Sequence, residues 1–567
     1  MADTVSALAD ELVTVILDEE PIAASMLGIG AHPDRLGDFS EAAEAELRAR
    51  YLDIDTRADA VPAAELSDRE RITHALIRHE CGRRVDVLDA RQIEFTVTDF
   101  LVSPVPRLLT TLPDLPIDTL ELADAYLARL AAIPEHLANA TDRHRAGTEA
   151  GRTLVRRLAE AAIRQLNDKA ADRLRREPAD AAPSSPVSSP TPWTGPTHSD
   201  QFLARQEELI GGTVRPAFAA YRAAVTDLLP AARPDEKPGL CWLPDGEATY
   251  ASLARAYTTT DRTAQDLHDT GLAIIERLAD EYRELGSRVF GSTDLAEIFT
   301  HVREDPSLRW ASGQQVLDTA RAVLARAVEA VPRWFGVVAE QQCLVRPTPP
   351  GAASSAIPMY YRVPALDGSR PGTYYANTEN VTDRSRIVAE ATAFHEGVPG
   401  HHFQHAIMDE LPDLPVLHKL AGATAYVEGW GLYTERLADE MGLYSDDVAR
   451  LGMLVYDSMR AGRLVVDTGM HALGWSRQRA IEFLRDRTPM TISEINTEID
   501  RYIGFPGQAL AYMVGRLEIQ RLRAHAGSVL GDAFDLRAFH DVVLGNGKLP
   551  LAILDTVIEE WITRRGH

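Results

Sequence analysis

A chain of 567 residues, 45% hydrophobic and 25% charged, has the composition of a globular protein with a sizeable core. Its formal net charge of −25 argues against nucleic acid as a partner, because binding phosphate requires a concentrated basic surface. No apolar run approaches the ~20 residues that a membrane span requires, so we expect no insertion into a membrane.

Cysteine content and the amino-terminal residues bear on metal chemistry and on location. Cys81, Cys241 and Cys343 are too few and too dispersed for a disulfide framework or a thiolate zinc site. Any metal must therefore be bound by histidine and carboxylate. The first residues carry no basic side chain and lead into Glu11 and Asp18, the opposite of a secretory signal, so we expect a cytoplasmic protein.

Helical periodicity begins with the first segment. Apolar residues recur there at helical spacing, with acidic residues on the other side: Val5, Leu8, Leu12, Val15 and Ile16. Residues 317–331 consist largely of strong helix formers, and a second apolar stripe comprises Leu267, Ile274, Ile275 and Leu278. The sequence therefore predicts a mainly α fold with a large helical body.

Two segments interrupt the helical pattern. Residues 178–200 are rich in Pro, Ser, Thr and Ala and cannot bury enough apolar area to offset chain entropy, so we predict a surface loop. Aromatic and β-branched residues between Pro and Gly breakers in residues 346–377 predict two short strands. We expect a helical lobe of residues 1–345 and a second lobe of residues 346–567, joined in one continuous structural unit.

The second predicted strand contains Tyr374 and Tyr375. A small sheet or hairpin beside a metal-binding cleft offers an edge along which an extended substrate binds, and these tyrosines are then candidate substrate contacts. The alternative is a hairpin that serves only packing. The residue pattern does not separate the two.

Residues 393–402 read Ala-Phe-His-Glu-Gly-Val-Pro-Gly-His-His and form the densest group of potential zinc ligands. In the familiar His-Glu-x-x-His pattern, two histidines on one helical face bind zinc and the glutamate activates water. His395 and Glu396 belong to an apolar helical stripe, so we place them on a packed helix. Pro399 cannot donate to the helical ladder, which predicts that the helix kinks or ends there.

The second histidine of this motif is ambiguous. In an unbroken helix, at ~100° per residue, His402 would return to the face of His395. If the Pro-Gly pair instead loops out, His401 takes that place. Spacing alone does not decide between them.

A catalytic zinc usually has three protein ligands and an open position for water. Glu428, on the next predicted helix, is the candidate third ligand. Glu435 lies two turns further on, ~10 Å along the axis, and so suits a role in orienting a ligand histidine. Zinc is preferred on ligand type, although other divalent metals accept the same groups.

Taken together, these residues resemble the bacterial DUF885 proteins, which carry a His-Glu-x-x-Pro-Gly-His-His signature. The likeness covers most of the chain and includes residues 242–246 (Trp-Leu-Pro-Asp-Gly), 370–375 (Arg-Pro-Gly-Thr-Tyr-Tyr), 428–430 (Glu-Gly-Trp), 467–471 (Asp-Thr-Gly-Met-His) and 501–509 (Arg-Tyr through Pro-Gly-Gln-Ala). More distantly, the motif is similar to helical gluzincins such as thimet-type oligopeptidases, which have His-Glu-x-Gly-His followed by a glutamate on the next helix. That likeness implies a zincin-like body with His401 as the second ligand, and it supports Glu428 as the third.

The same likeness implies a tyrosine or histidine on a later helix that stabilises an oxyanion. Tyr512 resembles that tyrosine. His471 is a second candidate, and we expect the carboxylate of Asp467, four residues before it on a helix, to hold its ring. Arg501 is a candidate clamp for a substrate carboxylate. Each also has a structural interpretation: a core tyrosine, a buried structural histidine and an arginine that bridges helices.

We therefore predict a zinc-dependent hydrolase of peptide or related amide bonds. His395, His401 and Glu428 would bind zinc, and Glu396 would take a proton from water and deliver it to the leaving nitrogen. Two alternatives stay open: a zinc enzyme acting on a non-peptide C–N bond in specialised metabolism, and a non-catalytic helical scaffold with a structural metal. A fourth protein ligand such as His402 in place of water would indicate the scaffold. The oligomeric state and the choice between endo and exo cleavage are not indicated.

Overall fold

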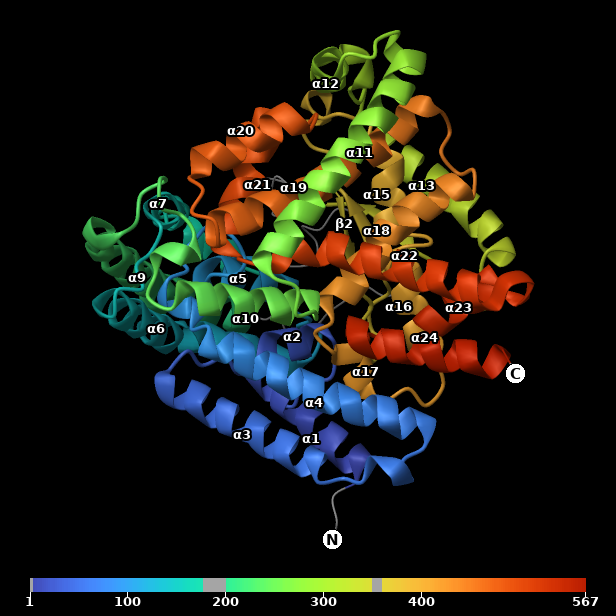
Figure 1. Cartoon of the computed structure of the whole chain (residues 1–567). Helices are drawn as coiled ribbons and strands as arrows, with labels where there is room; N and C mark the ends of the chain where they lie inside the picture. The colour runs from blue at the N-terminus through green and yellow to red at the C-terminus, as the bar shows by residue number, and fades with distance from the viewer. Residues whose placement is uncertain (1–3, 177–199, 349–358, 567) are drawn as a thin grey trace.

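The computed structural model describes residues 4–176, 200–348 and 359–566 (Figure 1). Helices make up most of these residues and the strands form one small sheet, which confirms the predicted mainly α fold. In the part of the chain described, no helix combines the length and the apolar character needed to cross a membrane. The predicted loop at 178–200 lies outside the described residues except for Asp200, the first residue of a helix.

The first helices form one edge of the molecule: α1 (Val5–Glu19), α2 (Pro21–Met26), α3 (Glu41–Asp59) and α4 (Asp68–Asp89). α1, α3 and α4 pack side by side at the lower edge of Figure 1. The side chains of Thr4, Ser40 and Ser67 cap these three helices by accepting from backbone N–H groups. The apolar stripe predicted for the first segment is buried on α1, so that helix prediction is confirmed.

A second group of helices packs around its own apolar core: α5 (Pro104–Thr111), α6 (Leu120–Glu149), α7 (Arg156–Gln165), α8 (Asp200–Leu209) and α9 (Arg215–Leu228). α6, α7 and α9 lie on the left of Figure 1. The long α6 contacts α5, α8 and α9, and apolar side chains of all five helices fill the space between them.

Four further helices follow, of which α12 lies at the top and α13 at the upper right of Figure 1: α10 (Gly246–Thr258), α11 (Ala264–Phe290), α12 (Leu295–Glu304) and α13 (Gly313–Ala330). The second predicted stripe is buried on α11, which packs along the later helix α19 (Asp447–His471). Residues 317–331 fall within α13 and the first residue of the short turn that follows it. Both helix predictions are confirmed.

The sheet has three strands in the order β1-β3-β2: β1 (Leu344–Pro347), β2 (Met359–Arg362) and β3 (Thr373–Ala376). β2 and β3 are the two predicted strands, and they pair antiparallel with Tyr361 opposite Tyr374. The prediction missed β1, which pairs in parallel with β3. A strand of 4 residues that ends in proline carries no alternating pattern long enough to detect, and parallel pairing leaves no turn signature.

The carboxyl-terminal helices complete the fold: α15 (Ala389–Glu396), α16 (His401–Glu410), α17 (Val416–Leu420), α18 (Thr424–Glu440), α19, α20 (Arg477–Arg487), α21 (Ile492–Gly504), α22 (Ala511–Leu530), α23 (Leu536–Leu544) and α24 (Leu551–Arg565). α18 packs lengthwise against α22 and also contacts α15. The largest apolar core includes residues of both predicted lobes, among them Leu278 and Leu464. The boundary at residue 345 stays a prediction.

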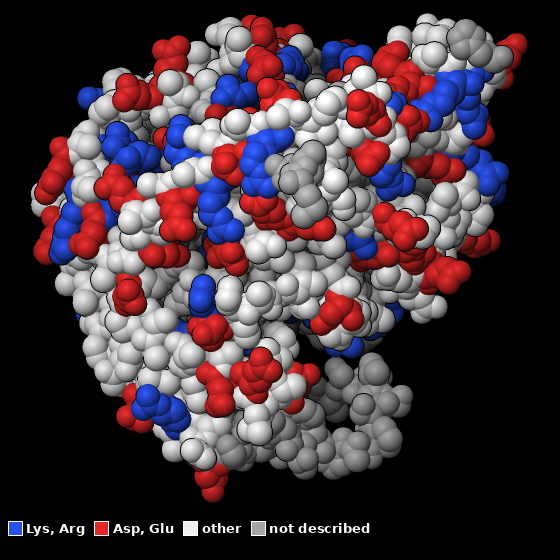
Figure 2. Space-filling view, turned by 90° about the horizontal axis from the view of Figure 1, so that it is seen from below, with Lys and Arg blue, Asp and Glu red and all other residues white. Residues whose placement is uncertain are grey.

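Acidic and basic side chains are intermixed on the face shown in Figure 2. Many arginines of the described chain pair with carboxylates, as Arg57 Nη2 does with Glu11 Oε2 at 2.8 Å. No concentrated basic area is visible on this face of the described residues. This distribution agrees with the expectation that nucleic acid is not a partner, which stays a prediction.

Glu80 ties the amino-terminal helices to the carboxyl-terminal ones. It is buried, and its carboxylate accepts from Arg83, from Arg84 and from the backbone N–H of Gly422 just before α18. Burial opposes ionisation, but the two guanidiniums outweigh it and lower the pKa of Glu80 to about 2. Because this pKa is depressed in the fold, the carboxylate stabilises the protein above a pH of about 4.5, and this contribution is lost as the pH falls toward 2.

Glu80→Gln is expected to lower the free energy of unfolding by ~3 kcal/mol at pH 7, because Arg83 loses its carboxylate partner and Arg84 keeps only Glu19. The difference in the free energy of unfolding between this variant and wild type should become smaller as the pH falls below about 4.5. Urea unfolding at pH 7 and pH 4 measures both effects, with Glu46→Gln, at an exposed position of α3, as the control. A difference that does not change with pH would contradict the charge role.

Candidate metal centre

α15 ends and α16 begins on either side of residues 397–400, so the predicted break at Pro399 is confirmed. Gly400 approaches the end of α15 so closely that a Cβ there would overlap the carbonyl oxygen of His395. Only glycine fits this turn without displacing the backbone. The turn brings His401 back beside His395, and their rings meet edge to face with 4.7 Å between centroids.

Three potential ligands converge at this point. Oε2 of Glu428 on α18 lies 3.5 Å from Nε2 of His395 and 3.4 Å from Nε2 of His401. One ligand atom of each residue lies within 4.8 Å of the others, a spacing that one metal ion can bridge. Among the residues that the structure describes, no other set of three histidine, cysteine or carboxylate side chains gathers in this way.

The donor set fits a divalent metal. Two imidazole nitrogens and one carboxylate oxygen are ligands found at catalytic zinc sites, and other first-row divalent ions accept them as well. His395 and His401 are buried, whereas the Glu428 side chain is 20% exposed, so the cluster can be reached from the glutamate side. Nδ1 of His395 is hydrogen-bonded to Oε1 of Glu435 at 2.8 Å, which leaves Nε2 to face the cluster.

α18 holds both halves of the cluster in place. Gly431 lets the His395 ring lie against the helix, since a Cβ at this position would come 2.7 Å from Cε1 of the ring. The indole of Trp430 donates to the carbonyl oxygen of Pro399 at 2.9 Å and so anchors the turn between α15 and α16. One helix therefore supplies a ligand, the carboxylate that orients another ligand, and the anchor of the turn.

The carboxylates set the charge of the cluster. Burial disfavours the protonated form of His395, but the hydrogen bonds to Glu428 and Glu435 outweigh it and raise the pKa of His395 to about 9. Burial also opposes ionisation of Glu428, yet His395 and His401 hold the pKa of that carboxyl well below its usual range. The cluster thus favours positive charge at its centre, and a divalent cation supplies it in competition with the proton.

His402 faces away from the three ligands. Its Nε2 donates to the backbone carbonyl of Gln341 at 2.9 Å, and its Nδ1 accepts from the hydroxyl of Tyr361 at 3.1 Å. The tautomer follows from the carbonyl, which can only accept. Both ring nitrogens therefore hold α16 to neighbouring segments, and the geometry favours His401 in the choice that spacing leaves open.

Glu396 is the last residue of α15 and lies next to His395 in the chain. Its Oε2 accepts from the backbone N–H of Tyr361 on β2 at 3.0 Å. Because β2 is an edge strand, this N–H points away from β3, and the open edge of the sheet borders the carboxylate. The small sheet therefore lies beside the candidate metal residues as predicted, while its role toward a substrate stays a prediction.

Two further predicted residues lie near the cluster. The Tyr512 ring on α22 is partly exposed and stacks 6.4 Å from the His395 ring, centroid to centroid. Burial raises the pKa of its hydroxyl, which keeps that group protonated and able to donate at neutral pH. Arg501 is already engaged, with Nη2 donating to Glu498 at 3.0 Å and Nη1 to Gln508 at 2.9 Å.

The predicted pairing of His471 with Asp467 is wrong. His471 is fully buried, with Nδ1 accepting from the backbone N–H of Leu240 at 3.2 Å and Nε2 donating to the carbonyl of Tyr502 at 3.0 Å. Asp467 accepts instead from the hydroxyl of Tyr250 at 2.6 Å. Spacing along α19 places both side chains on one face, but their partners come from segments that the spacing does not reveal. With both nitrogens engaged, His471 cannot stabilise an oxyanion.

The prediction that Tyr374 contacts a substrate is also wrong. This side chain has no exposed surface, and its hydroxyl lies 2.7 Å from the sulfur of Met359 inside the core beneath the sheet. Tyr375 lies on the opposite face of β3, as strand alternation requires, and stacks on Tyr360 with 5.2 Å between centroids. Of Tyr374 and Tyr375, only Tyr375 is partly exposed and so accessible to a substrate.

Two arginines beside the cluster are not among the predicted site residues. Arg460 and Arg463 lie on α19 and are both buried, and Nη2 of Arg460 is 4.0 Å from Oε1 of Glu435. Two arginines three residues apart in a largely apolar helix are the signal that could have found them, because a buried charge requires a partner.

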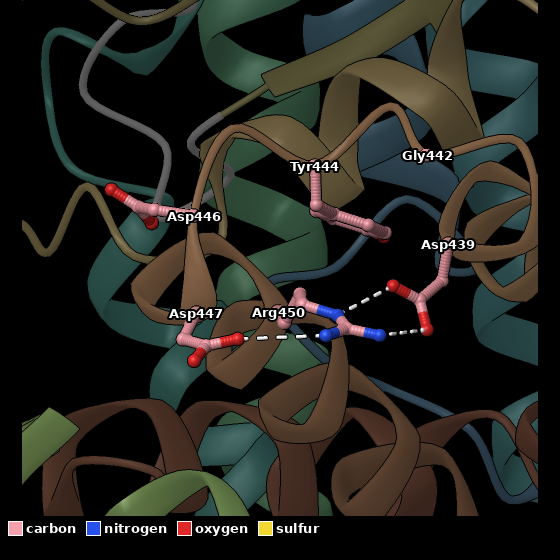
Figure 3. Close-up of a pocket in the computed structure, with 6 residues that line it drawn as sticks. All are labelled: Asp439, Gly442, Tyr444, Asp446, Asp447 and Arg450. Carbon is pink, nitrogen blue, oxygen red and sulfur yellow. Dashed lines mark hydrogen bonds and ion pairs between the residues drawn. The ribbon is translucent and has the colours of Figure 1, made fainter. Parts of the chain in front are cut away.

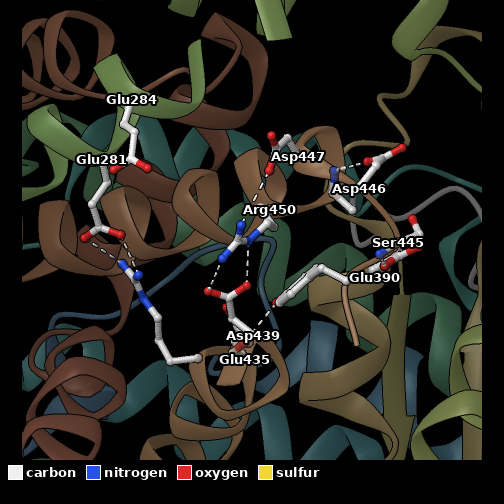
Figure 4. Close-up of polar contacts among 12 residues, drawn as sticks. Glu281, Glu284, Glu390, Glu435, Asp439, Ser445, Asp446, Asp447 and Arg450 are labelled. Atoms are coloured by element: carbon white, nitrogen blue, oxygen red, sulfur yellow. Dashed lines mark hydrogen bonds and ion pairs between the residues drawn. The ribbon is translucent and has the colours of Figure 1, made fainter. Parts of the chain in front are cut away.

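A separate surface hollow lies at the far end of α18 (Figure 3). Its lining residues are Asp439, Gly442, Tyr444, Asp446, Asp447 and Arg450. Arg450 lies between two carboxylates and pairs with both, Asp439 at 2.6 Å and Asp447 at 3.5 Å (Figure 4). Tyr444 links this end to the cluster, since its hydroxyl donates to the backbone carbonyl of Glu435 at 3.0 Å. The paired charges that line the hollow, Arg450 with Asp439 and Asp447, indicate a structural role for this hollow.

Comparisons with known proteins support one family. Residues 21–558 match the model of a family described as bacterial protein of unknown function, DUF885. A solved structure from Colwellia psychrerythraea, provisionally described as a lipoprotein, is 25% identical with a TM-score of 0.86, covering 99% of this chain and 100% of that one. Another from Shewanella oneidensis, provisionally described as a lipoprotein of unknown function, is 17% identical with a TM-score of 0.75 over 98% and 100%, and shows the fold alone. No curated protein matches the sequence.

His401→Ala is expected to lower the affinity for zinc by more than ~100-fold, because it removes one of three ligands. His402→Ala should leave the affinity nearly unchanged, since both nitrogens of that ring are engaged elsewhere. Zinc content after dialysis and competition with a chromogenic chelator measure both variants. Loss of zinc from the His402 variant alone would reverse the assignment.

Glu435→Gln is expected to weaken zinc binding by ~10–100-fold, because an amide holds the His395 imidazole less firmly than a carboxylate does. Glu440→Gln, at an exposed position on the same helix, is the matched control. The same chelator competition gives both affinities. Equal affinity in the Glu435 variant and wild type would show that this contact does not orient the ligand.

Proposed function

The chain belongs to the DUF885 family of bacterial proteins, and we propose that it is a zinc-dependent hydrolase of peptide or related amide bonds. The observation that carries the proposal is the convergence of two imidazoles and one carboxylate within 4.8 Å, with Glu396 next to His395 in the chain and its charge acting on that imidazole. The Glu428 side chain is 20% exposed, and we expect water and a substrate carbonyl to reach the metal from this side, which a closed structural metal site does not allow.

Each residue has a distinct part in this proposal. His395, His401 and Glu428 would hold the metal, which when bound supplies a Lewis acid that acidifies water and polarises a carbonyl group. Glu396 accepts a proton from the attacking water and delivers it to the leaving nitrogen. Its Oε2 is held by the N–H of Tyr361, which leaves Oε1 for the proton.

A hydroxyl donor completes the arrangement. Negative charge develops on the carbonyl oxygen as water adds, and a preorganised donor lowers that barrier. Tyr512 suits this role because its hydroxyl stays protonated and its ring lies beside that of His395. The open edge of β2 next to Glu396 offers backbone groups to an extended substrate.

The likeness to gluzincin peptidases is part of the proposal and supports its mechanism. Those enzymes combine a His-Glu pair, a second histidine and a glutamate on the next helix, and this chain offers the same order with a longer turn before His401. The descriptions of the solved neighbours name no activity. Turnover must therefore be measured on this protein itself.

We likewise keep a cytoplasmic location as a proposal. The two solved neighbours are provisionally described as lipoproteins. Fractionation of cells that produce the protein distinguishes a cytoplasmic location from association with the membrane. Recovery with the membranes would contradict the proposal.

Glu396→Gln is expected to lower kcat by at least ~100-fold while leaving zinc content unchanged, because the amide cannot accept the proton. Glu390→Gln on the same helix is the control, since Glu390 pairs with Arg326 and accepts from the hydroxyl of Ser445, which is drawn beside it in Figure 4. Both variants and wild type are assayed with zinc on peptides of several lengths. Unchanged activity in the Glu396 variant would contradict the proposed mechanism.

The same assay separates the remaining alternatives. Cleavage of peptides supports the proposal. Absence of peptide cleavage with turnover of small amides would favour a substrate with a non-peptide C–N bond, and absence of all turnover in zinc-loaded protein would favour a structural metal.

A further inference from the structure

Three arginines surround Tyr512, the tyrosine beside the metal cluster. The guanidinium carbon of Arg463 lies 4.5 Å from the centroid of the Tyr512 ring, and that of Arg460 lies 5.8 Å from it. Arg501 donates to Gln508, which precedes Tyr512 by about one helical turn. Positive charge therefore gathers on one side of the cluster, in a chain whose net charge is −25.

Two of these arginines share a single carboxylate. Nη2 of Arg463 donates to Glu498 at 2.8 Å, and its Nε donates to the hydroxyl of Tyr502 at 2.9 Å. Arg501 donates to both oxygens of Glu498, at 3.2 and 3.0 Å. One carboxylate thus faces two guanidiniums, which leaves positive charge in excess. Arg501, which is predicted to bind a substrate carboxylate, is therefore already engaged by the carboxylate of Glu498.

Arg460 is less fully satisfied. Its side chain is 8% exposed, and its nearest carboxylate oxygen, Oε1 of Glu435 at 4.0 Å, is already hydrogen-bonded to His395. Nε and Nη1 of Arg460 have no acceptor among the described residues. The guanidinium lies over the ring of Tyr456 at 4.1 Å, which fixes its position. A buried cation with free donors is costly unless an anion completes its hydrogen bonds.

We propose that Arg460 binds the terminal carboxylate of the substrate. The inference rests on the hydrolase function proposed above and adds a direction to it: the chain is cut near its carboxyl end rather than in its interior. A planar guanidinium forms two parallel hydrogen bonds to a carboxylate, a match that a neutral amide cannot provide.

The position of Arg460 bears on how far the cut lies from that end. Oε1 of Glu435 lies 4.0 Å from Nη2 of Arg460 and 2.8 Å from Nδ1 of His395, so the guanidinium lies close to a predicted metal ligand, and the proposal places the bound carboxylate within one or two residues of the bond that is cut. Water supplies the hydroxyl of the new carboxyl group on the upstream product. Its remaining proton passes to the amine of the released fragment as the C–N bond breaks.

Binding rather than turnover tests this inference. Acetyl-trialanine with a free carboxyl end and the same peptide as its carboxyl-terminal amide differ only in that carboxylate. Calorimetric titration of the Glu396→Gln protein, with zinc and after its removal by a chelator, should show the acid binding at least ~10-fold more tightly than the amide. Equal affinities would overturn the proposal.

Variants on α19 identify the residue responsible. Arg460→Met keeps a long side chain over Tyr456 but removes the charge, and the preference for the acid should fall below ~3-fold. Arg450→Met is the matched control because Arg450 pairs with Asp439 and Asp447 at the surface, and it should keep the full preference. A preference retained in the Arg460 variant would overturn the assignment.

A second variant covers a failure of Arg460→Met to fold, which circular dichroism detects. Arg460→Lys keeps the charge without the planar fork, and most of the preference for the acid should then be lost. A preference that the lysine variant keeps in full would overturn the bidentate contact.

A third probe distinguishes the chain end from an acidic side chain. Acetyl-Ala-Ala-Glu amide carries its carboxylate on the side chain, and it should bind no more tightly than the carboxyl-terminal amide of acetyl-trialanine. Binding as tight as that of the free acid would overturn recognition of the chain end.

The two proposals fail separately. An Arg460-dependent preference for the acid without hydrolysis of any probe would support the carboxylate site and contradict the hydrolase. Equal binding of acid and amide together with hydrolysis would contradict only the carboxylate site.

Discussion

Pro399 cannot continue the helix that carries His395 and Glu396, and the geometry of the whole site depends on that constraint. In a continuous helix His401 would point ~120° away from His395, at ~100° per residue over six residues. The missing amide hydrogen of proline ends α15, and the four-residue turn brings the second imidazole back to the first. Trp430 on α18 binds the carbonyl of Pro399, so the helix that carries Glu428 also holds the turn.

Charge balance connects the cluster to its surroundings. The carboxylates of Glu428 and Glu435 both lie against His395, and a divalent cation between the imidazoles would offset their negative charge. On the other side, two arginines share Glu498, and Arg460 has only a distant oxygen of Glu435. A protein with a net charge of −25 thus concentrates positive charge beside its candidate metal residues, which suits a substrate that brings an anion with it.

Local signals in the sequence predict much of this structure. Periodic apolar residues predict α1 and α11, strong helix formers predict α13, and the chemistry of proline predicts the end of α15. Helical spacing also anticipates that Glu435 lies far enough from Glu428 to contact the back of His395.

Contacts between distant segments are not predictable in this way. The parallel strand β1, the backbone partners of His471 and the burial of Tyr374 depend on residues more than ten positions away, and no spacing rule encodes them. Arg460 and Arg463 are not predicted for the same reason, because their importance lies in the groups that α18, α21 and α22 place around them.

His395, His401 and Glu428 are proposed to hold a divalent metal with one position open. Zinc X-ray absorption spectroscopy of the loaded protein tests this proposal most directly. We expect two imidazoles and only nitrogen or oxygen neighbours at ~2.0–2.2 Å from the zinc, with a water among them. A sulfur neighbour, or a third imidazole in place of water, would contradict it.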